Sequence, residues 1–110
     1  MSITDKIRKA LESIDIENYY IERGNEKNNC IVYTYSEFSD YYADNKEKSV
    51  KYTVLLNLYT LNSIEKYKKQ VNESMIKEGF IRKSVASTMK DATGFFNTPF
   101  IFEIRLRNEE

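Results

Sequence analysis

The chain contains no histidine and no tryptophan, and it has one cysteine, one proline and three glycines. Without histidine it lacks the commonest general base and metal ligand, so no Ser-His or Cys-His nucleophile pair can form. A zinc site would need a cluster of cysteine and histidine ligands. Gly24, Gly79 and Gly94 fit neither a P-loop nor a dinucleotide-binding motif. We therefore expect no catalytic residue, no cofactor and no metal site, and we predict that the protein is not an enzyme.

The single cysteine, Cys30, cannot form a disulfide within the chain, whereas small secreted domains often hold several. It opens a segment with strand character, so we interpret it as a small apolar filler rather than a nucleophile. No apolar run approaches the roughly 20 residues of a membrane span. Residues 1–11 include Lys6, Arg8 and Lys9 but no apolar run, so we expect no signal peptide. The sequence predicts one cytosolic domain over residues 1–110.

Charge is balanced, because 17 basic and 17 acidic residues give a formal net charge of zero. Domains that bind nucleic-acid phosphates usually have a basic excess or a basic stripe. The nearest candidate, Lys66, Lys68 and Lys69, shares a predicted helix with Glu65 and Glu73, which is typical of a solvated helix face. Tyrosine is abundant, with nine residues, but no RNA-binding motif surrounds the tyrosines. We therefore expect neither a nucleic-acid nor a membrane partner.

Two segments have the apolar periodicity of helices. In residues 3–15 the stripe is Ile3, Ile7, Leu11 and Ile14. In residues 63–78 it is Ile64, Tyr67, Val71 and Met75. Ser2, with Asp5 three residues later, resembles a capping box at the start of the first helix. We predict Asn62 as the cap of the second helix and Gly79 as its C-terminal stop.

Alternation of apolar and polar residues predicts the strands, which are residues 18–22, 30–38, 49–61, 80–90 and 95–106. The clearest is 49–61, whose even positions are more apolar and should face the core. Pro99 indicates that the last strand begins at an edge or a bulge. Polar segments 23–29, 39–48 and 91–94 are interpreted as a turn, a long hairpin loop and a tight turn.

The predicted order α-β-β-β-α-β-β indicates an α+β fold. Hairpin connections predict a mostly antiparallel sheet of four to five strands, with two helices packed on one face. The sequence shows no internal repeat and no linker.

The predicted loop 39–48 holds Tyr41 and Tyr42, which are large side chains in a polar segment. Either they fold back onto their own sheet, or the loop inserts into a neighbouring subunit, where tyrosine is favoured. On the second reading, the subunit interface would comprise Phe38, Tyr41, Tyr42, Leu55 and Tyr59. The acidic residues of this loop do not match an EF-hand, so we interpret them as solvated.

Several local features together resemble a known family. Residues 54–59 (Val-Leu-Leu-Asn-Leu-Tyr) lead into a helix that ends at Gly79-Phe80. A turn at residues 91–96 (Asp-Ala-Thr-Gly-Phe-Phe) then precedes Phe-Ile-Phe-Glu-Ile at residues 100–104. This order, after an N-terminal helix and a long-looped hairpin, resembles the small tail-completion and tail-terminator proteins, or head–tail joining proteins, of long-tailed bacteriophages. The resemblance covers nearly the whole chain at the level of architecture.

The resemblance implies a non-catalytic phage or prophage protein that forms a ring, often of six subunits, at the head-proximal end of the tail. Its partners would be copies of itself, the tail-tube protein and head-connector proteins. It would reside in the bacterial host cytoplasm during assembly and then in the virion tail. The alternative is a small cytoplasmic adaptor or regulatory domain that binds another protein without catalytic activity.

Overall fold

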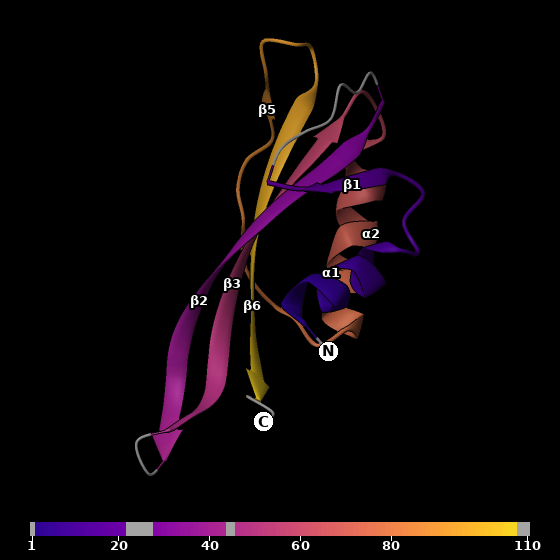
Figure 1. Cartoon of the computed structure of the whole chain (residues 1–110). Coiled ribbons are helices and arrows are strands. Elements are labelled where there is room, and N and C mark those ends of the chain that lie inside the picture. The colour runs from indigo at the N-terminus through magenta and orange to yellow at the C-terminus, as the bar shows by residue number, and fades with distance from the viewer. Residues whose placement is uncertain (1, 22–27, 44–45, 108–110) are drawn as a thin grey trace.

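The computed structural model describes residues 2–21, 28–43 and 46–107, with only the backbone described for residues 39–43 and 46–48. It is an α+β fold with two helices and a mixed six-stranded sheet (Figure 1). The elements are α1 (Ile3–Leu11), β1 (Glu17–Tyr20), β2 (Cys30–Ala43), β3 (Lys46–Thr60), α2 (Ile64–Lys77), β4 (Ile81–Val85), β5 (Met89–Lys90) and β6 (Phe96–Arg107).

The sheet has the strand order β1-β2-β3-β6-β4. The short strand β5 lies off this path and pairs with the beginning of β6, at Phe96 and Asn97. Pairing is antiparallel except between β1 and β2, which are parallel. The prediction of a mostly antiparallel sheet is therefore confirmed, but the predicted count of four to five strands is wrong. The sixth strand arises because segment 80–90 is two short strands, β4 and β5, separated by residues 86–88.

Helix α1 begins as predicted, since the Ser2 hydroxyl accepts a hydrogen bond from the Asp5 backbone N–H at 3.1 Å. It ends at Leu11 rather than at residue 15. Short polar side chains such as Ser13 and Asp15 compete with helical backbone hydrogen bonds, which favours termination here. Ile14 nevertheless remains buried, because the backbone continues around the helix end with its N–H donating to the Leu11 carbonyl.

Helix α2 starts one residue later than predicted, and Asn62 is not its cap. The N-cap is Ser63, in the left-handed region at φ 54°, and its side chain makes no capping hydrogen bond. The C-terminal stop at Gly79 is confirmed, with φ 97°. Gly79 N–H donates to the Ile76 carbonyl and Phe80 N–H to the Met75 carbonyl, which is the Schellman arrangement. This turn places Phe80 in the core.

One sheet face forms the core with both helices (Figure 1). The predicted even face of β3 is confirmed, since Val54, Leu56 and Leu58 are fully buried. Cross-strand register aligns them with buried partners on β2 and β6; for example, Leu56 pairs with Tyr33 on one side and Phe100 on the other. Fully burying side chains of this size contributes about 1.5–3 kcal/mol each.

The predicted loop over residues 39–48 is wrong for most of its length. β2 continues to Ala43 and β3 begins at Lys46, so the hairpin is paired almost to its end. β6 pairs with β3 only from Ser49 onward. The ends of β2 and β3 therefore form a two-stranded ribbon that projects from the body (Figure 1), and the molecule measures 52 × 25 × 24 Å. Sequence periodicity missed the ribbon because residues 39–48 do not alternate between apolar and polar types.

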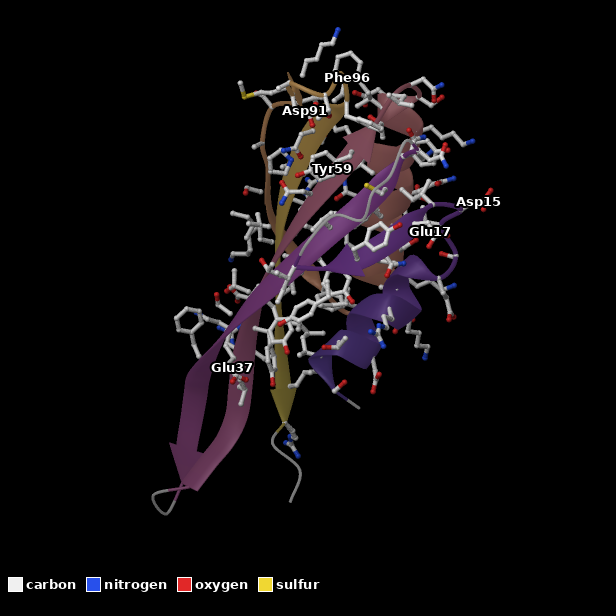
Figure 2. The ribbon with its side chains drawn as sticks, turned by 45° about the horizontal axis from the view of Figure 1, so that its top comes forward. Asp15, Glu17, Glu37, Tyr59, Asp91 and Phe96 are labelled. Carbon is white, nitrogen blue, oxygen red and sulfur yellow. The ribbon has the colours of Figure 1, made fainter. Side chains whose placement is uncertain are left out.

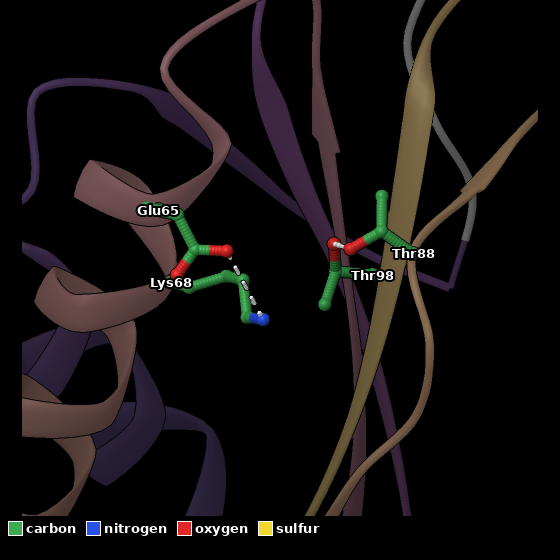
Figure 3. A network of polar contacts seen from close by, with 4 residues as sticks. All are labelled: Glu65, Lys68, Thr88 and Thr98. Atoms are coloured by element: carbon green, nitrogen blue, oxygen red, sulfur yellow. Dashed lines mark hydrogen bonds and ion pairs between the residues drawn. The ribbon is translucent and has the colours of Figure 1, made fainter.

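Pro99 does not lie at the sheet edge, because β6 has neighbours on both sides. Its carbonyl accepts a hydrogen bond from Ala86 N–H at 2.9 Å, in the gap between β4 and β5. The N and O atoms of a strand residue point to the same neighbour, so the missing N–H of proline also faces this gap. Beside it, the Thr88 and Thr98 hydroxyls lie 2.6 Å apart (Figure 3), which ties the β4–β5 connection to β6.

Candidate interaction surface

The sheet face opposite the helices carries large apolar side chains that remain exposed. Strand residues alternate between faces, so the neighbours of the buried core residues point away from the helices. Leu55, on β3, pairs with Ile101, on β6, and they are 42% and 36% exposed. We call this surface the outer face and define it by Phe38, Lys51, Leu55, Ile81, Ile101 and Arg105. Clustered exposed apolar side chains on a sheet typically mark a binding surface.

One end of the outer face is basic. Phe38 pairs with Lys51, whose ammonium nitrogen lies 5.5 Å from the centre of the Phe38 ring. Lys51 pairs in turn with Arg105, whose guanidinium lies 3.3 Å from the Glu103 carboxylate. Arg107, two residues further along β6, is also exposed. The outer face is therefore apolar around Leu55 and Ile101 and becomes cationic near the ribbon.

The five predicted interface residues have different positions. Phe38 and Leu55 both lie exposed on the outer face. Tyr59, two pleats along β3 from Leu55, is half-buried and pairs with Cys30 and Asn97 (Figure 2). Tyr41 and Tyr42 lie in the ribbon of β2, but their side chains are outside the described residues. The structure thus brings Phe38 and Leu55 onto one exposed surface, with Tyr59 half-buried on the same sheet face.

Four outer-face residues were not predicted as interface residues. Lys51, Ile81, Ile101 and Arg105 join the surface only through cross-strand register, which one sequence does not reveal. A partial signal existed in β6, because Ile101 alternates with the more aromatic core positions. Ile81, in the predicted strand 80–90, is exposed and pairs with Glu103. A bulge between Arg82 and Ser84 breaks the alternation of this strand.

The free edge of β2 is a second unusual feature. β1 pairs with β2 only from Cys30 to Tyr33. Ile21 then donates its N–H to the Tyr33 carbonyl at 2.9 Å and turns away with φ 72°. In the part of the chain that the structure describes, no strand pairs with this side of β2 beyond Tyr33. The free edge is therefore open to pairing with another chain.

Tyr20, at the end of β1, stacks on the Tyr35 ring with centroids 5.6 Å apart, and its ring lies 5.7 Å from that of Tyr33. A hydrogen bond with Tyr35 raises the pKa of the Tyr20 phenol above its ordinary value. Tyr35 also contacts Tyr52 edge to face at 5.8 Å. These rings extend the core face towards the ribbon, where neither helix covers it (Figure 1).

Two open cavities lie on the helix side. One, of about 600 Å³, is lined mainly by polar groups, among them Asp15, Glu17, Asn29 and Tyr67. The other, of about 480 Å³, lies between α2 and β4, near the Glu65–Lys68 ion pair (Figure 3). Within the described residues, no group of three or more acidic, cysteine or histidine side chains is arranged to hold a metal ion. Neither cavity brings together a nucleophile and a base.

Comparison with protein-family models and with curated proteins finds no match for this chain. Among the described residues, no helix is long and apolar enough to cross a membrane. Cys30 is fully buried, as expected for an apolar filler. The arrangement that distinguishes the molecule is therefore a surface: the exposed apolar side chains around Leu55 and Ile101, on a sheet face that continues towards a projecting ribbon.

Proposed function

We propose that this chain is a structural subunit of a homomeric ring at the head-proximal end of the tail of a long-tailed bacteriophage. In this role it would complete the tail or join it to the head connector. The proposal describes a non-catalytic protein, in keeping with the lack of histidine in the sequence. Its partners would be copies of itself, the tail-tube protein and head-connector proteins, first in the host cytoplasm and then in the virion.

The observation that carries the proposal is the uncovered outer face. The Leu55–Ile101 pair lies in the middle of the sheet and stays 42% and 36% exposed, so only another protein layer could bury the rest of these two side chains. A second protein layer over this face would bury the pair and exclude water from it. Assembly with another protein is thus the simplest physical reason for the exposed apolar side chains of the outer face.

The ribbon supports the same proposal. A two-stranded hairpin without a third strand or a packed face is only marginally stable in water. Here β2 and β3 stay paired beyond Ser49, the point at which β6 ends its pairing with β3. We therefore expect the ribbon to lie against a neighbouring subunit in the ring. A ring needs two different surfaces on each subunit, and the ribbon lies apart from the outer face, so both can take part in contacts between neighbours.

The oligomeric state tests this proposal. We expect light scattering and native mass spectrometry to detect a ring when the chain is mixed with tail-tube protein, with the free chain partly or wholly monomeric. The matched control is Leu55→Lys, which alters the outer face without removing a core residue. A wild-type chain that stays monomeric in both conditions would count decisively against the ring.

The free edge of β2 favours one alternative, an adaptor that binds an extended peptide by adding a strand. Its unpaired positions begin near Tyr35 and continue to Glu37. An adaptor would bind its partner as a one-to-one complex and would not form a ring. Native mass spectrometry therefore separates the two functions in the same experiment.

A further inference from the structure

The outer face has a chemical complement elsewhere on the same chain. β1 is the terminal strand at one side of the sheet, and the connection from α1 leads into it. Asp15 and Glu17 are exposed on this segment (Figure 2), and Tyr20 and Ile21 follow at 43% and 61% exposure. We call these four residues the β1 edge patch. It combines carboxylates with apolar side chains, whereas the outer face combines cations with apolar side chains.

We infer that the β1 edge patch of one subunit docks on the outer face of the next subunit in the ring. This inference rests on the proposed function, because it names the contact by which copies would join. Ile21 would cover Leu55 and Ile101, and the exposed part of the Tyr20 ring, which stacks on Tyr35 within its own subunit, would lie at the rim of the contact. The carboxylates of the patch would approach Lys51 and its basic neighbours.

Charge selects this patch over the other exposed apolar side chains. Ile76 and Met89 are followed by charges of both signs, Lys77 with Glu78 and Lys90 with Asp91, so neither has the net negative charge that Asp15 and Glu17 give the β1 edge patch. Leu61 lines the same cavity as Asp15 and Glu17, so it belongs to the acidic side of the molecule. The chain has zero net charge, so whole subunits neither attract nor repel one another strongly. Opposite charges at the contact can therefore direct which surfaces meet.

Ile21 supplies an independent argument. A β-branched residue at positive φ is strained, and here φ is 72°. Its side chain is largely exposed, so packing within the subunit does not compensate for the strain. The strained backbone instead holds an apolar side chain outward at the end of β1. Burial of the Ile21 side chain against a neighbouring subunit would offset the strain of its backbone conformation.

The two surfaces share no residue, so their contact is heterologous. The β1 edge patch lies at the terminal strand, and the outer face spans β2, β3, β6 and β4. A heterologous contact repeated around an axis closes into a ring, or continues as a filament if the rotation does not close. A self-complementary contact would give a dimer instead. This inference therefore agrees with a ring rather than a twofold pair.

Zero-length cross-linking tests the contact directly under the conditions in which the ring forms. A carbodiimide joins a carboxylate to an amine only when they touch, so we expect intermolecular cross-links from Lys51 to Asp15 or Glu17, identified by mass spectrometry. Lys51→Arg keeps the charge but removes the amine. It should leave the ring intact and abolish these cross-links. A ring without them would overturn the docking but leave the proposed function standing.

Charge reversal provides a second measurement. Lys51→Glu with Arg107→Glu should weaken assembly about tenfold, since the reversal replaces attraction between exposed charges with repulsion. Adding Asp15→Lys and Glu17→Lys should restore it. The control, Lys66→Glu with Lys69→Glu, makes the same change of net charge on α2 and should leave assembly unchanged. Equal weakening by the control, or no rescue, would overturn the docking, and a monomeric wild type would overturn the ring as well.

Discussion

Leu55 and Leu56 are adjacent on β3, yet one is exposed on the outer face and the other is fully buried in the core. The strand pleat separates them, because successive side chains point to opposite faces of the sheet. Leu56 packs among buried residues of the helices and the neighbouring strands, whereas Leu55 faces outward beside Ile101. The same residue type therefore serves stability at one position and, in our proposal, assembly at the next.

Substituting these two leucines should separate folding from assembly. We expect Leu56→Ala to lower the free energy of unfolding by about 2–5 kcal/mol, as for other large-to-small core changes. Leu55→Lys should change it by no more than about 1 kcal/mol while preventing ring formation. Urea unfolding measures the first quantity and native mass spectrometry the second. Equal losses of stability would contradict the assigned faces of β3.

The backbone at Gly79 makes a second prediction. Gly79→Ala should destabilise the fold by about 1–2 kcal/mol, since a left-handed conformation strains residues that carry a Cβ atom. The added methyl has room, its nearest contact being the Ile104 side chain at 3.8 Å, so strain rather than a clash is responsible. Gly79→Asn is the control, because asparagine tolerates this region better. If the two variants lose the same stability, backbone conformation is not the cause.

Substitution of Ile21 should stabilise the isolated subunit, whereas substitution of Gly79 should destabilise it. Replacing Ile21 with asparagine, which accepts positive φ more readily, should stabilise the isolated subunit by up to about 1 kcal/mol. The same substitution should weaken the ring, because it removes an apolar side chain from the β1 edge patch. Thermal unfolding of the monomer and the dissociation constant of the ring would be measured in parallel. A less stable monomer would show that Ile21 contributes to packing within its own subunit.

The paired hydroxyls of Thr88 and Thr98 make a fourth prediction. Thr98 is fully buried, so Thr88→Val should lower the free energy of unfolding by about 1–3 kcal/mol by leaving the Thr98 hydroxyl without this partner. The double variant, with both threonines changed to valine, should lose less than the sum of the two single variants. Urea unfolding of all four proteins completes the double-mutant cycle. Strict additivity would mean that the two groups do not interact.

Sequence patterns predicted the parts of the fold that depend on local chemistry. The core face of β3 follows from strict alternation, and Gly79 ends α2 because its conformation suits a residue without Cβ. The turn before β6 is confirmed at Asp91, whose carboxylate accepts hydrogen bonds from the Thr93 and Phe95 N–H groups, and at Gly94, with φ 91°. In each case nearby residues determine the outcome.

Features that depend on distant residues were missed. The parallel pairing of β1 with β2 and the position of β6 between β3 and β4 come from tertiary packing. The ribbon was missed because the sequence of residues 39–48 does not alternate between apolar and polar types. For the candidate surface, Phe38 was predicted from the segment next to the expected loop and Leu55 from the strand 49–61, but their grouping with Ile81 and Ile101 required the register of four strands.

The location of β6 within the sheet also bears on how the protein folds during synthesis. Before β6 leaves the ribosome, β3 has an unpaired edge, and the buried residues of β3 lack their partners Phe100 and Phe102. The nascent domain must therefore hold an incomplete sheet open until nearly the whole described chain has emerged. Such an intermediate exposes apolar surface and a strand edge, so it is the stage at which misassembly between nascent chains is most favoured.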